Sequence, residues 1–253
     1  MTQTHDAVVD AQFGPRAAAY VESAVHAAGA DLDALAAIAA RVRPARALDL
    51  GCGGGHVAYR LAAHAGEVTA CDLSPEMLAA VAETARARGL ANLVTRQAAA
   101  ERLPFADASF DLTATRFSAH HWGDLDAGLS EARRVTRPGA PAVFIDAVSP
   151  GRPLLDSHLQ AVELLRDPSH VRDYTTAEWT AAAERAGFTA TAMARHRIRI
   201  EFASWIARMR TPALQAEAVR ALQTAASGEV RDHFAIEDDG SFMLDVMVLE
   251  TVA

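Results

Sequence analysis

The sequence predicts an α/β protein whose mostly parallel β-sheet carries helices on both faces. Short apolar segments alternate with amphipathic helices over residues 47–147. Helices of that length between strands imply right-handed crossovers and parallel pairing. The segment 142–147 is apolar throughout, as in strands that are buried on both faces. After residue 149 the alternation stops, which indicates a differently built C-terminal part.

Seven strands are expected from runs of apolar and β-branched residues. They cover residues 47–50, 67–71, 93–97, 110–115, 142–147, 190–202 and 242–251. The last two are expected to pair antiparallel, with helices at 204–209 and 213–224 inserted between them. These elements together predict a doubly wound sheet within one domain.

Capping residues define the expected helices of the core. Ser74 precedes a proline and is expected to be an N-cap, as is Asp124. Thr175 and Glu178 have the spacing of a capping box. The core helices are expected at residues 56–65, 75–88, 125–135, 154–165 and 176–186.

The N-terminal segment is expected to hold a mobile arm and two helices. Residues 1–12 form the arm, and the first helix is expected from Pro15 to Gly29. Asp31 is expected to cap a second helix, which ends before Pro44. Because this pair precedes the first strand, we expect it to cover the cleft at the end of the sheet.

Composition excludes several classes of protein. The formal net charge of −8 argues against a nucleic-acid binder, which needs clustered Lys and Arg. Cys52 and Cys71 have no metal-ligand spacing, so we expect neither a metal nor a disulfide, and a reducing cytoplasm. The polar N-terminus lacks a signal core, and no apolar run is long enough for a membrane span. The composition therefore argues against a nucleic-acid partner and against a membrane-spanning protein.

A glycine-rich turn after the first strand indicates a cofactor site. Gly51, Gly53 and their neighbours allow close approach of the backbone to a ligand, and a helix begins directly after them. Asp49 stands at the end of the strand, where a carboxylate faces the positive end of a ligand. Asp72 ends the next strand and suits ribose hydroxyls. The pattern predicts a cofactor that contains a nucleoside.

Four blocks of sequence carry a resemblance to a known family. The chain resembles the class I S-adenosylmethionine-dependent methyltransferases, and among them the methyltransferase type 11 group, which is similar to ubiquinone and menaquinone biosynthesis enzymes. The resemblance implies a Rossmann-like sheet with a reversed last strand. The blocks are residues 48–55, 72–78, 100–105 with 109–111, and 131–139.

The resemblance also implies roles for individual residues. Asp49, with the glycine-rich turn, would hold the amino and carboxylate end of the methionine, and Asp72 would bind the ribose hydroxyls. Ala99 departs from the family, which often has an acid there for the adenine amino group. Adenine recognition would then use backbone groups and water. The full set of expected cofactor residues is Asp49, Gly51, Cys52, Gly53, Asp72, Leu73, Met77, Ala100, Glu101, Arg116 and Phe117.

A nicotinamide cofactor is the alternative for the glycine-rich turn. Residues 53–58 match G-x-G-x-x-A, and Asp72 follows at a suitable distance. Asp49 and the three later blocks favour S-adenosylmethionine over NAD. Methylation of nucleic-acid bases is disfavoured, because residues 115–118 lack the Asn- or Asp-Pro-Pro-aromatic motif of amino-methylating enzymes.

Two histidines after the fourth strand are candidate catalytic residues. The imidazole of His120 or His121 titrates near neutrality and could deprotonate an acceptor, or both rings could serve packing and capping instead. Aromatic, acidic and Arg side chains near the same edge are candidates for the acceptor pocket. These pocket candidates are Tyr20, Trp122, Asp146, Tyr174 and Arg208.

The sequence thus predicts methyl transfer from S-adenosylmethionine to an O, C or N atom of a small molecule. A protein that binds the cofactor without transferase activity stays open as the alternative, because binding motifs do not show turnover. Residues 1–44 would form a helical lid, 45–148 the cofactor-binding core, and 149–253 the C-terminal part of the same domain with the helical caps. A monomer and a homodimer are both compatible with the sequence.

Overall fold

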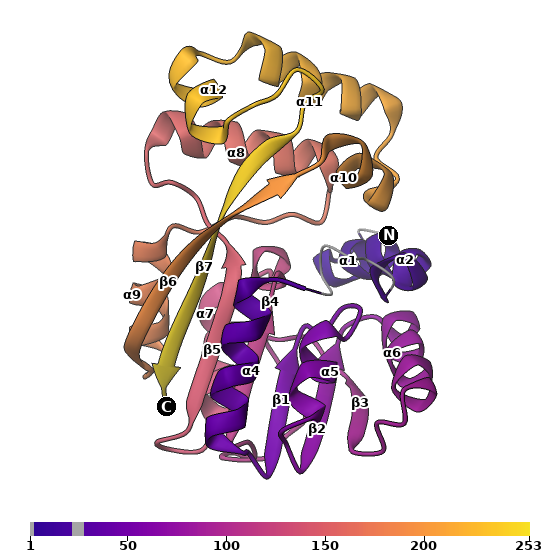
Figure 1. Cartoon of the computed structure of the whole chain (residues 1–253), viewed down its shortest axis with the longest axis vertical. Helices are drawn as coiled ribbons and strands as arrows, with labels where there is room; N and C mark the ends of the chain where they lie inside the picture. The colour runs from indigo at the N-terminus through magenta and orange to yellow at the C-terminus, as the bar shows by residue number, and fades with distance from the viewer. Residues whose placement is uncertain (1–2, 22–27) are drawn as a thin grey trace.

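The computed structural model describes residues 3–21 and 28–253, and a single sheet of seven strands runs through this part of the chain (Figure 1). The strand order is β3-β2-β1-β4-β5-β7-β6. Strands β1 to β5 pair in parallel, and β7 runs antiparallel to both β5 and β6. This confirms the predicted fold class and the reversed last strand. The strands are β1 (Arg46–Leu50), β2 (Glu67–Asp72), β3 (Leu93–Gln97), β4 (Leu112–Arg116), β5 (Pro141–Ala147), β6 (Thr189–Ile200) and β7 (Phe242–Val252).

Alternation of side chains along the strands builds one apolar core on each face of the sheet. On β5, Val143 and Ile145 point into the first core, whereas Phe144 points into the second and lies against Trp179. Each core is completed by helices that bury an apolar stripe. The first core receives α4 (Ala30–Val42), α5 (His56–Ala62) and α6 (Pro75–Ala87), and the second receives α7 (Leu125–Val135) and α9 (Thr176–Arg185).

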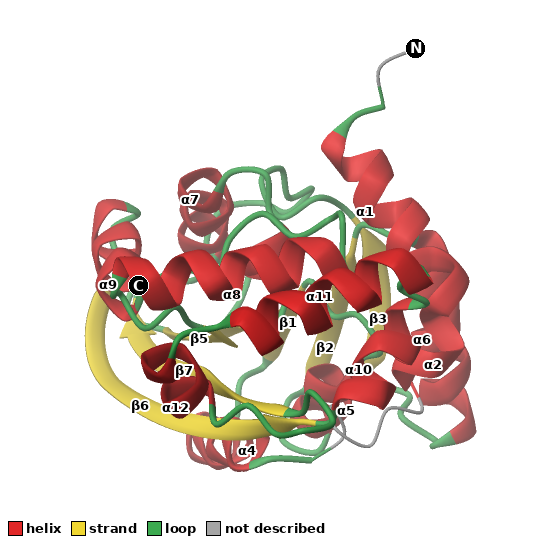
Figure 2. Cartoon of the chain, turned by 90° about the horizontal axis from the view of Figure 1, so that it is seen from above, coloured by secondary structure: helices red, strands yellow, loops and turns green. Residues whose placement is uncertain are grey.

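A third apolar core lies beyond the carboxyl ends of the parallel strands. Strands β6 and β7 extend past the rest of the sheet, and helices pack on their extension (Figure 1). Figure 2 shows α8 and α11 side by side in this region. Helix α12 is a short helix of seven residues that was not predicted from the sequence. The helices are α8 (Pro153–Arg166), α10 (Phe202–Met209), α11 (Ala213–Ala225) and α12 (Gly228–Phe234).

The N-terminal helices lie between the sheet and this third core (Figure 1). They are α1 (His5–Phe13), the 3₁₀-turn Gly14–Arg16 and α2 (Ala17–Val21). The expected mobile arm is therefore wrong over α1, whose first turn is capped by the Thr4 hydroxyl. The remainder of the expected first helix falls on 22–27, outside the described residues.

Local capping rules hold at some helix starts and fail at others. Asp124 accepts from the Ala127 amide, and Thr175 forms the predicted capping box. Ser74 precedes α6 but bonds the Glu76 carboxylate instead of a helix amide, so its expected capping bond is wrong. Asp31 is also not a cap. It lies in the first turn of α4, where its carboxylate forms a buried ion pair with Arg116.

The described helices include none that combines the length and apolar character needed to cross a membrane.

Helix α8 provides a matched test of the third core. Leu159 is 1% exposed and Leu164 is 55% exposed on the same helix. We expect Leu159→Ala to lower the free energy of unfolding by about 2–5 kcal/mol, because it removes buried methyl groups and leaves a cavity. Leu164→Ala should change it by less than about 0.5 kcal/mol. Urea unfolding followed by circular dichroism measures both, and equal effects would contradict the proposed burial of α8.

Candidate active site

The glycine-rich turn after β1 is shaped by contacts that only glycine permits. At Gly51, with φ of 68°, a Cβ atom would lie 1.8 Å from the Ser118 hydroxyl oxygen. At Gly54 it would lie 2.6 Å from the carbonyl oxygen of Tyr20. The turn therefore packs directly against the loop after β4 and against α2. This close packing forms one wall of a cavity at the carboxyl ends of the strands.

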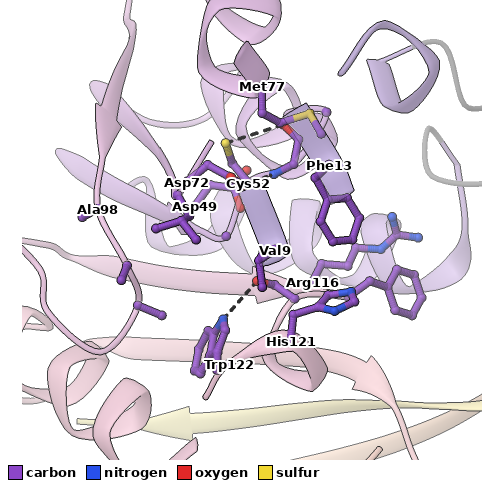
Figure 3. Close-up of a pocket in the computed structure, with 18 of the residues that line it drawn as sticks. Val9, Phe13, Asp49, Cys52, Asp72, Met77, Ala98, Arg116, His121 and Trp122 are labelled. Atoms are coloured by element: carbon purple, nitrogen blue, oxygen red, sulfur yellow. Dashed lines mark hydrogen bonds between the residues drawn. The ribbon is translucent and has the colours of Figure 1, made fainter. Parts of the chain in front are cut away.

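Asp49 and Asp72 occupy adjacent strand ends at this cavity (Figure 3). One Asp49 oxygen accepts from the Ala58 amide at 2.8 Å. The Asp72 oxygens accept from the amides of Gly53 at 2.8 Å and Ser74 at 3.0 Å. Each carboxyl group keeps acceptor capacity for a ligand, because a carboxyl oxygen accepts more than one hydrogen bond.

The electrostatic state of Asp49 is unusual. Burial, together with repulsion from Asp72, raises the pKa of Asp49 to about 8, although the Ala58 amide and Arg116 oppose the rise. Burial also raises the pKa of Asp72. Without a ligand, Asp49 is therefore protonated near neutral pH. A cationic group bound beside it would favour the carboxylate.

All eleven residues expected to bind the cofactor line this first cavity, which has a volume of about 1000 Å³. Ala99, where the family's acid is absent, lines it as well. The arrangement fits a ligand with a cationic group near Asp49 and hydroxyls near Asp72. The eleven residues are Asp49, Gly51, Cys52, Gly53, Asp72, Leu73, Met77, Ala100, Glu101, Arg116 and Phe117.

Helix α1 contributes lining residues that the sequence analysis missed. Asp6, Val9 and Phe13 face the first cavity, and Figure 3 shows Phe13 beside His121. The ring nitrogen Nε2 of His5 lies 2.8 Å from the carbonyl oxygen of His121. A signal was present in the chain, because Thr4 is a good N-cap and Asp6 stabilises the first helical turn.

A second cavity of about 620 Å³ adjoins the first. Four residues line both cavities, namely Phe13, Tyr20, Phe117 and His121. The far wall of the second cavity comes from α8, α10 and the extended ends of β6 and β7. Its other lining residues are His120, Ala147, Glu163, Arg166, Asp173, Ile198, Ile200, Trp205, Arg208 and Leu244.

His120 lines this cavity and forms an ion pair with Asp146. Its Nδ1 lies 2.5 Å from Oδ1 of Asp146, and its backbone amide donates to Oδ2 at 3.3 Å. Burial disfavours the charged imidazole, but the attraction and hydrogen bond of Asp146 outweigh burial and raise the pKa of His120 to about 9. His120 is therefore an imidazolium at neutral pH.

His121, the second of the two candidate histidines, is neutral. Its Nδ1 lies 3.1 Å from the carbonyl oxygen of Ser169, which accepts only, so Nδ1 carries the proton. Its Nε2 keeps its lone pair and lies 4.0 Å from Oδ2 of the buried Asp167 carboxylate. Burial, together with the positive charge of His120 at a ring distance of 4.2 Å, lowers the pKa of His121. Of the two histidines, only His121 lines both cavities.

The residues expected in the acceptor pocket lie in different places in the structure. Tyr20 lines both cavities, and Arg208 lines the second. Trp122 lines the first and donates to the Ser118 hydroxyl at 3.1 Å. Asp146 does not line the second cavity, and it influences the charge there only through its hydrogen bond to the His120 ring. Tyr174 was also expected in the acceptor pocket, but it lines neither cavity. Its ring instead meets the Trp179 ring edge-on, with the ring centroids 6.5 Å apart.

Sequence reasoning missed three charged residues of the second cavity. Glu163 and Arg166 lie on the buried face of α8, and Asp173 lies in the segment that follows. The sequence did contain a signal for them, because charged residues such as Glu163 lie on the apolar stripe of α8 beside Leu159 and Val162, where a charge is unusual unless it is paired. The described residues contain no cluster of three or more His, Cys, Asp or Glu side chains arranged to hold a metal ion.

Comparison with known proteins agrees with this geometry. Residues 48–144 match the model of the methyltransferase domain. The chain is 44% identical to the uncharacterized protein YafE of Escherichia coli over 78% of this chain and 95% of that protein. It is 33% identical to the uncharacterized methyltransferase YcgJ of Bacillus subtilis over 88% of each chain.

Solved structures give the same result. The YcgJ crystal structure superposes with a TM-score of 0.84 at 30% identity, covering 88% of this chain and 97% of that one. The BH2331 protein of Bacillus halodurans gives a TM-score of 0.84 at 28% identity, covering 88% and 99%. Four sequence blocks, a sheet with a reversed last strand and full-length relatives thus lead to one family. The chain belongs to the S-adenosylmethionine-dependent methyltransferases.

Proposed function

We propose that the protein transfers a methyl group from S-adenosylmethionine, bound in the first cavity, to a small molecule bound in the second. The observation that carries the proposal is that the two cavities share the side chains of Phe13, Tyr20, Phe117 and His121. A donor and an acceptor on either side of these residues would be held close enough to react. Positioning of this kind supplies much of the rate of a displacement reaction.

The first cavity would hold S-adenosylmethionine through its polar strand ends. Asp49 would accept from the ammonium group, and Asp72 would accept from the ribose hydroxyls. Leu73 and Met77 would flank the adenine, with Glu101 at its edge. When bound, the cofactor supplies an electrophilic methyl group on a sulfonium and leaves as S-adenosylhomocysteine. These residues bind and orient, and none of them needs to take part in bond making.

His121 would act as a weak general base, suited to an acceptor whose proton is already acidic, because burial and the charge of His120 lower the pKa of His121 to about 3. Its Nε2 lone pair is free of a proton, because Nδ1–H is committed to the Ser169 carbonyl. His120 would be unable to accept a proton at neutral pH, because Asp146 keeps it charged. Its positive charge would instead stabilise the anionic form of an acceptor group beside His121.

The N-terminal helices would exclude water from the reacting atoms. The rings of Phe13 and Tyr20 lie edge to face at 5.4 Å, and both line the two cavities. Tyr20 donates to the Met209 sulfur at 3.0 Å, and Arg16 donates to the Met209 carbonyl at 2.9 Å. These contacts connect the N-terminal helices to α10 and close the cavities from one side.

Cofactor identity and turnover are tested together. We expect S-adenosylhomocysteine to raise the melting temperature and NADH to leave it unchanged. Asp72→Ala should weaken S-adenosylhomocysteine binding about tenfold or more, because charge-assisted hydrogen bonds are lost. Asp33→Ala, at a side chain that is 69% exposed, is the control that should retain affinity.

Stabilisation by NADH alone would overturn the cofactor assignment. Incubation with S-adenosylmethionine and a panel of quinols, phenols, acids and amines should release S-adenosylhomocysteine with at least one acceptor. Tight binding without release for any acceptor class would favour a cofactor-binding protein without transferase activity.

Cofactor binding should release a proton from Asp49. The raised pKa keeps this carboxyl protonated below about pH 8, and a bound ammonium group favours the carboxylate. At about pH 7 we expect release of about one proton on S-adenosylhomocysteine binding. Calorimetry in phosphate and Tris, whose ionisation enthalpies differ, measures this release. Asp49→Asn should abolish it, and equal enthalpies for the wild-type protein in both buffers would contradict the assignment.

The base role of His121 is tested with the acceptor that the panel identifies. His121→Asn retains a donor for the Ser169 carbonyl but removes the imidazole base. We expect turnover to fall about 10²- to 10⁴-fold, while affinity for S-adenosylhomocysteine stays within about threefold. His64→Asn, outside both cavities, serves as the matched control. Full activity of His121→Asn would exclude general base catalysis by this residue.

A further inference from the structure

The second cavity holds an unequal set of charged side chains. The imidazolium of His120 pairs with Asp146, and the Arg166 guanidinium lies 3.7 Å from the Glu163 carboxylate. Arg208 lines the same cavity, yet it forms no ion pair with a carboxylate of residues 3–21 or 28–253. Among the described residues, Arg208 is therefore a positive charge of the cavity without a carboxylate at ion-pair distance.

The position of Arg208 makes this charge costly. It lies on α10, is partly buried, and its Nε has no hydrogen-bond partner among the described residues. Burial and repulsion from Arg166 lower the pKa of Arg208, while the Tyr20 hydroxyl and the attraction of Glu163 partly offset them. Arg166 cannot move away easily, because it stacks on the Trp205 ring at 4.8 Å. An anionic group in the cavity would relieve both the burial and the repulsion.

Asp173 raises the alternative of a cationic acceptor. Its carboxyl is buried and Oδ2 has no partner within the described chain. Gln160 holds the backbone of Asp173 in place, accepting from its amide at 3.1 Å and donating to its carbonyl at 2.8 Å. However, burial and repulsion from Glu163 raise the pKa of Asp173 and so work against its anionic form, although the charge of His120 partly offsets them. A neutral carboxyl donates a hydrogen bond and does not attract a cation.

The remaining wall of the cavity is apolar. Ile198 and Ile200 from β6, Leu244 from β7 and Trp205 from α10 line it. A ligand that fills this space therefore needs an apolar body as well as one charged group. Charge and shape together select an amphipathic anion over an amine or a sugar.

We propose that the acceptor is a small carboxylic acid with an apolar body, whose carboxylate pairs with Arg208. This inference rests on the proposed methyl transfer, because it places the acceptor in the second cavity. A guanidinium binds a planar carboxylate through two parallel hydrogen bonds, which orients the ligand as well as holding it. The group that receives the methyl lies elsewhere on the acid, toward His121. Arg208 is thus a specificity-determining residue.

Binding of matched acids and amides tests the proposal without requiring turnover. The probes are benzoate, phenylacetate, 4-hydroxybenzoate and hexanoate, each compared with its primary amide. Calorimetry is performed on protein saturated with S-adenosylhomocysteine. We expect at least one acid to bind about tenfold or more tightly than its amide. In Arg208→Gln this ratio should fall to about one, because the two cations that remain in the cavity, His120 and Arg166, are already paired with Asp146 and Glu163.

Two variants give the controls. Arg208→Lys keeps the positive charge but loses the two parallel N–H donors of the guanidinium, so it should retain part of the preference for the acid. Arg210→Gln changes an exposed arginine that follows the same helix and should leave the preference unchanged.

Three results would overturn the inference. They are amides that all bind as tightly as their acids, an acid preference that survives in Arg208→Gln, and failure of every acid to bind although S-adenosylhomocysteine binds. Failure of S-adenosylhomocysteine itself to bind would contradict the proposed function, and with it this inference.

Discussion

The buried ion pair between Asp146 and His120 is the interaction on which the arrangement of the site depends. Asp146 lies near the end of β5 and is 1% exposed, and a carboxylate left unpaired there would cost about 3–5 kcal/mol. Its oxygens accept from the His120 ring, the His120 amide and the Ala147 amide. The pair thereby holds the loop after β4 against β5. That constraint places the next residue, His121, between the two cavities and keeps it neutral.

The N-terminal helices depend on the same loop. His5 contacts the His121 carbonyl, and the Phe13 ring meets the His121 ring at 4.8 Å. At the other end, Tyr20 contacts Met209 on α10. These helices therefore do not merely cover a finished site. They form contacts with both the loop after β4 and the C-terminal helices, and their side chains complete the wall shared by the two cavities.

The sequence predicted the sheet and the first cavity because both depend on local patterns. A glycine-rich turn and acids at two strand ends are visible within about twenty residues of chain. The second cavity has no such pattern, since its lining comes from segments between Phe13 and Leu244 that meet only in the folded chain. Asp31 shows the same limit: a capping rule considers its neighbours, whereas its partner Arg116 is 85 residues away. Thr4 shows the opposite case. Its helix-capping signal was present in the local sequence, but the polar composition of residues 1–12 led to the prediction of a mobile arm.

The division into two cavities constrains how the site can vary. The first is built mainly at the ends of parallel strands, whereas eight of the fourteen residues that line the second lie beyond residue 150, on α8, α10, β6, β7 and the segment after α8. Changes in α8 or α10 would alter the acceptor without disturbing Asp49 or Asp72. The four shared residues do not have this freedom, because each must fit both ligands. Phe117 illustrates the constraint, since its left-handed backbone, with φ of 51°, costs about 1–2 kcal/mol and yet places its ring at the junction.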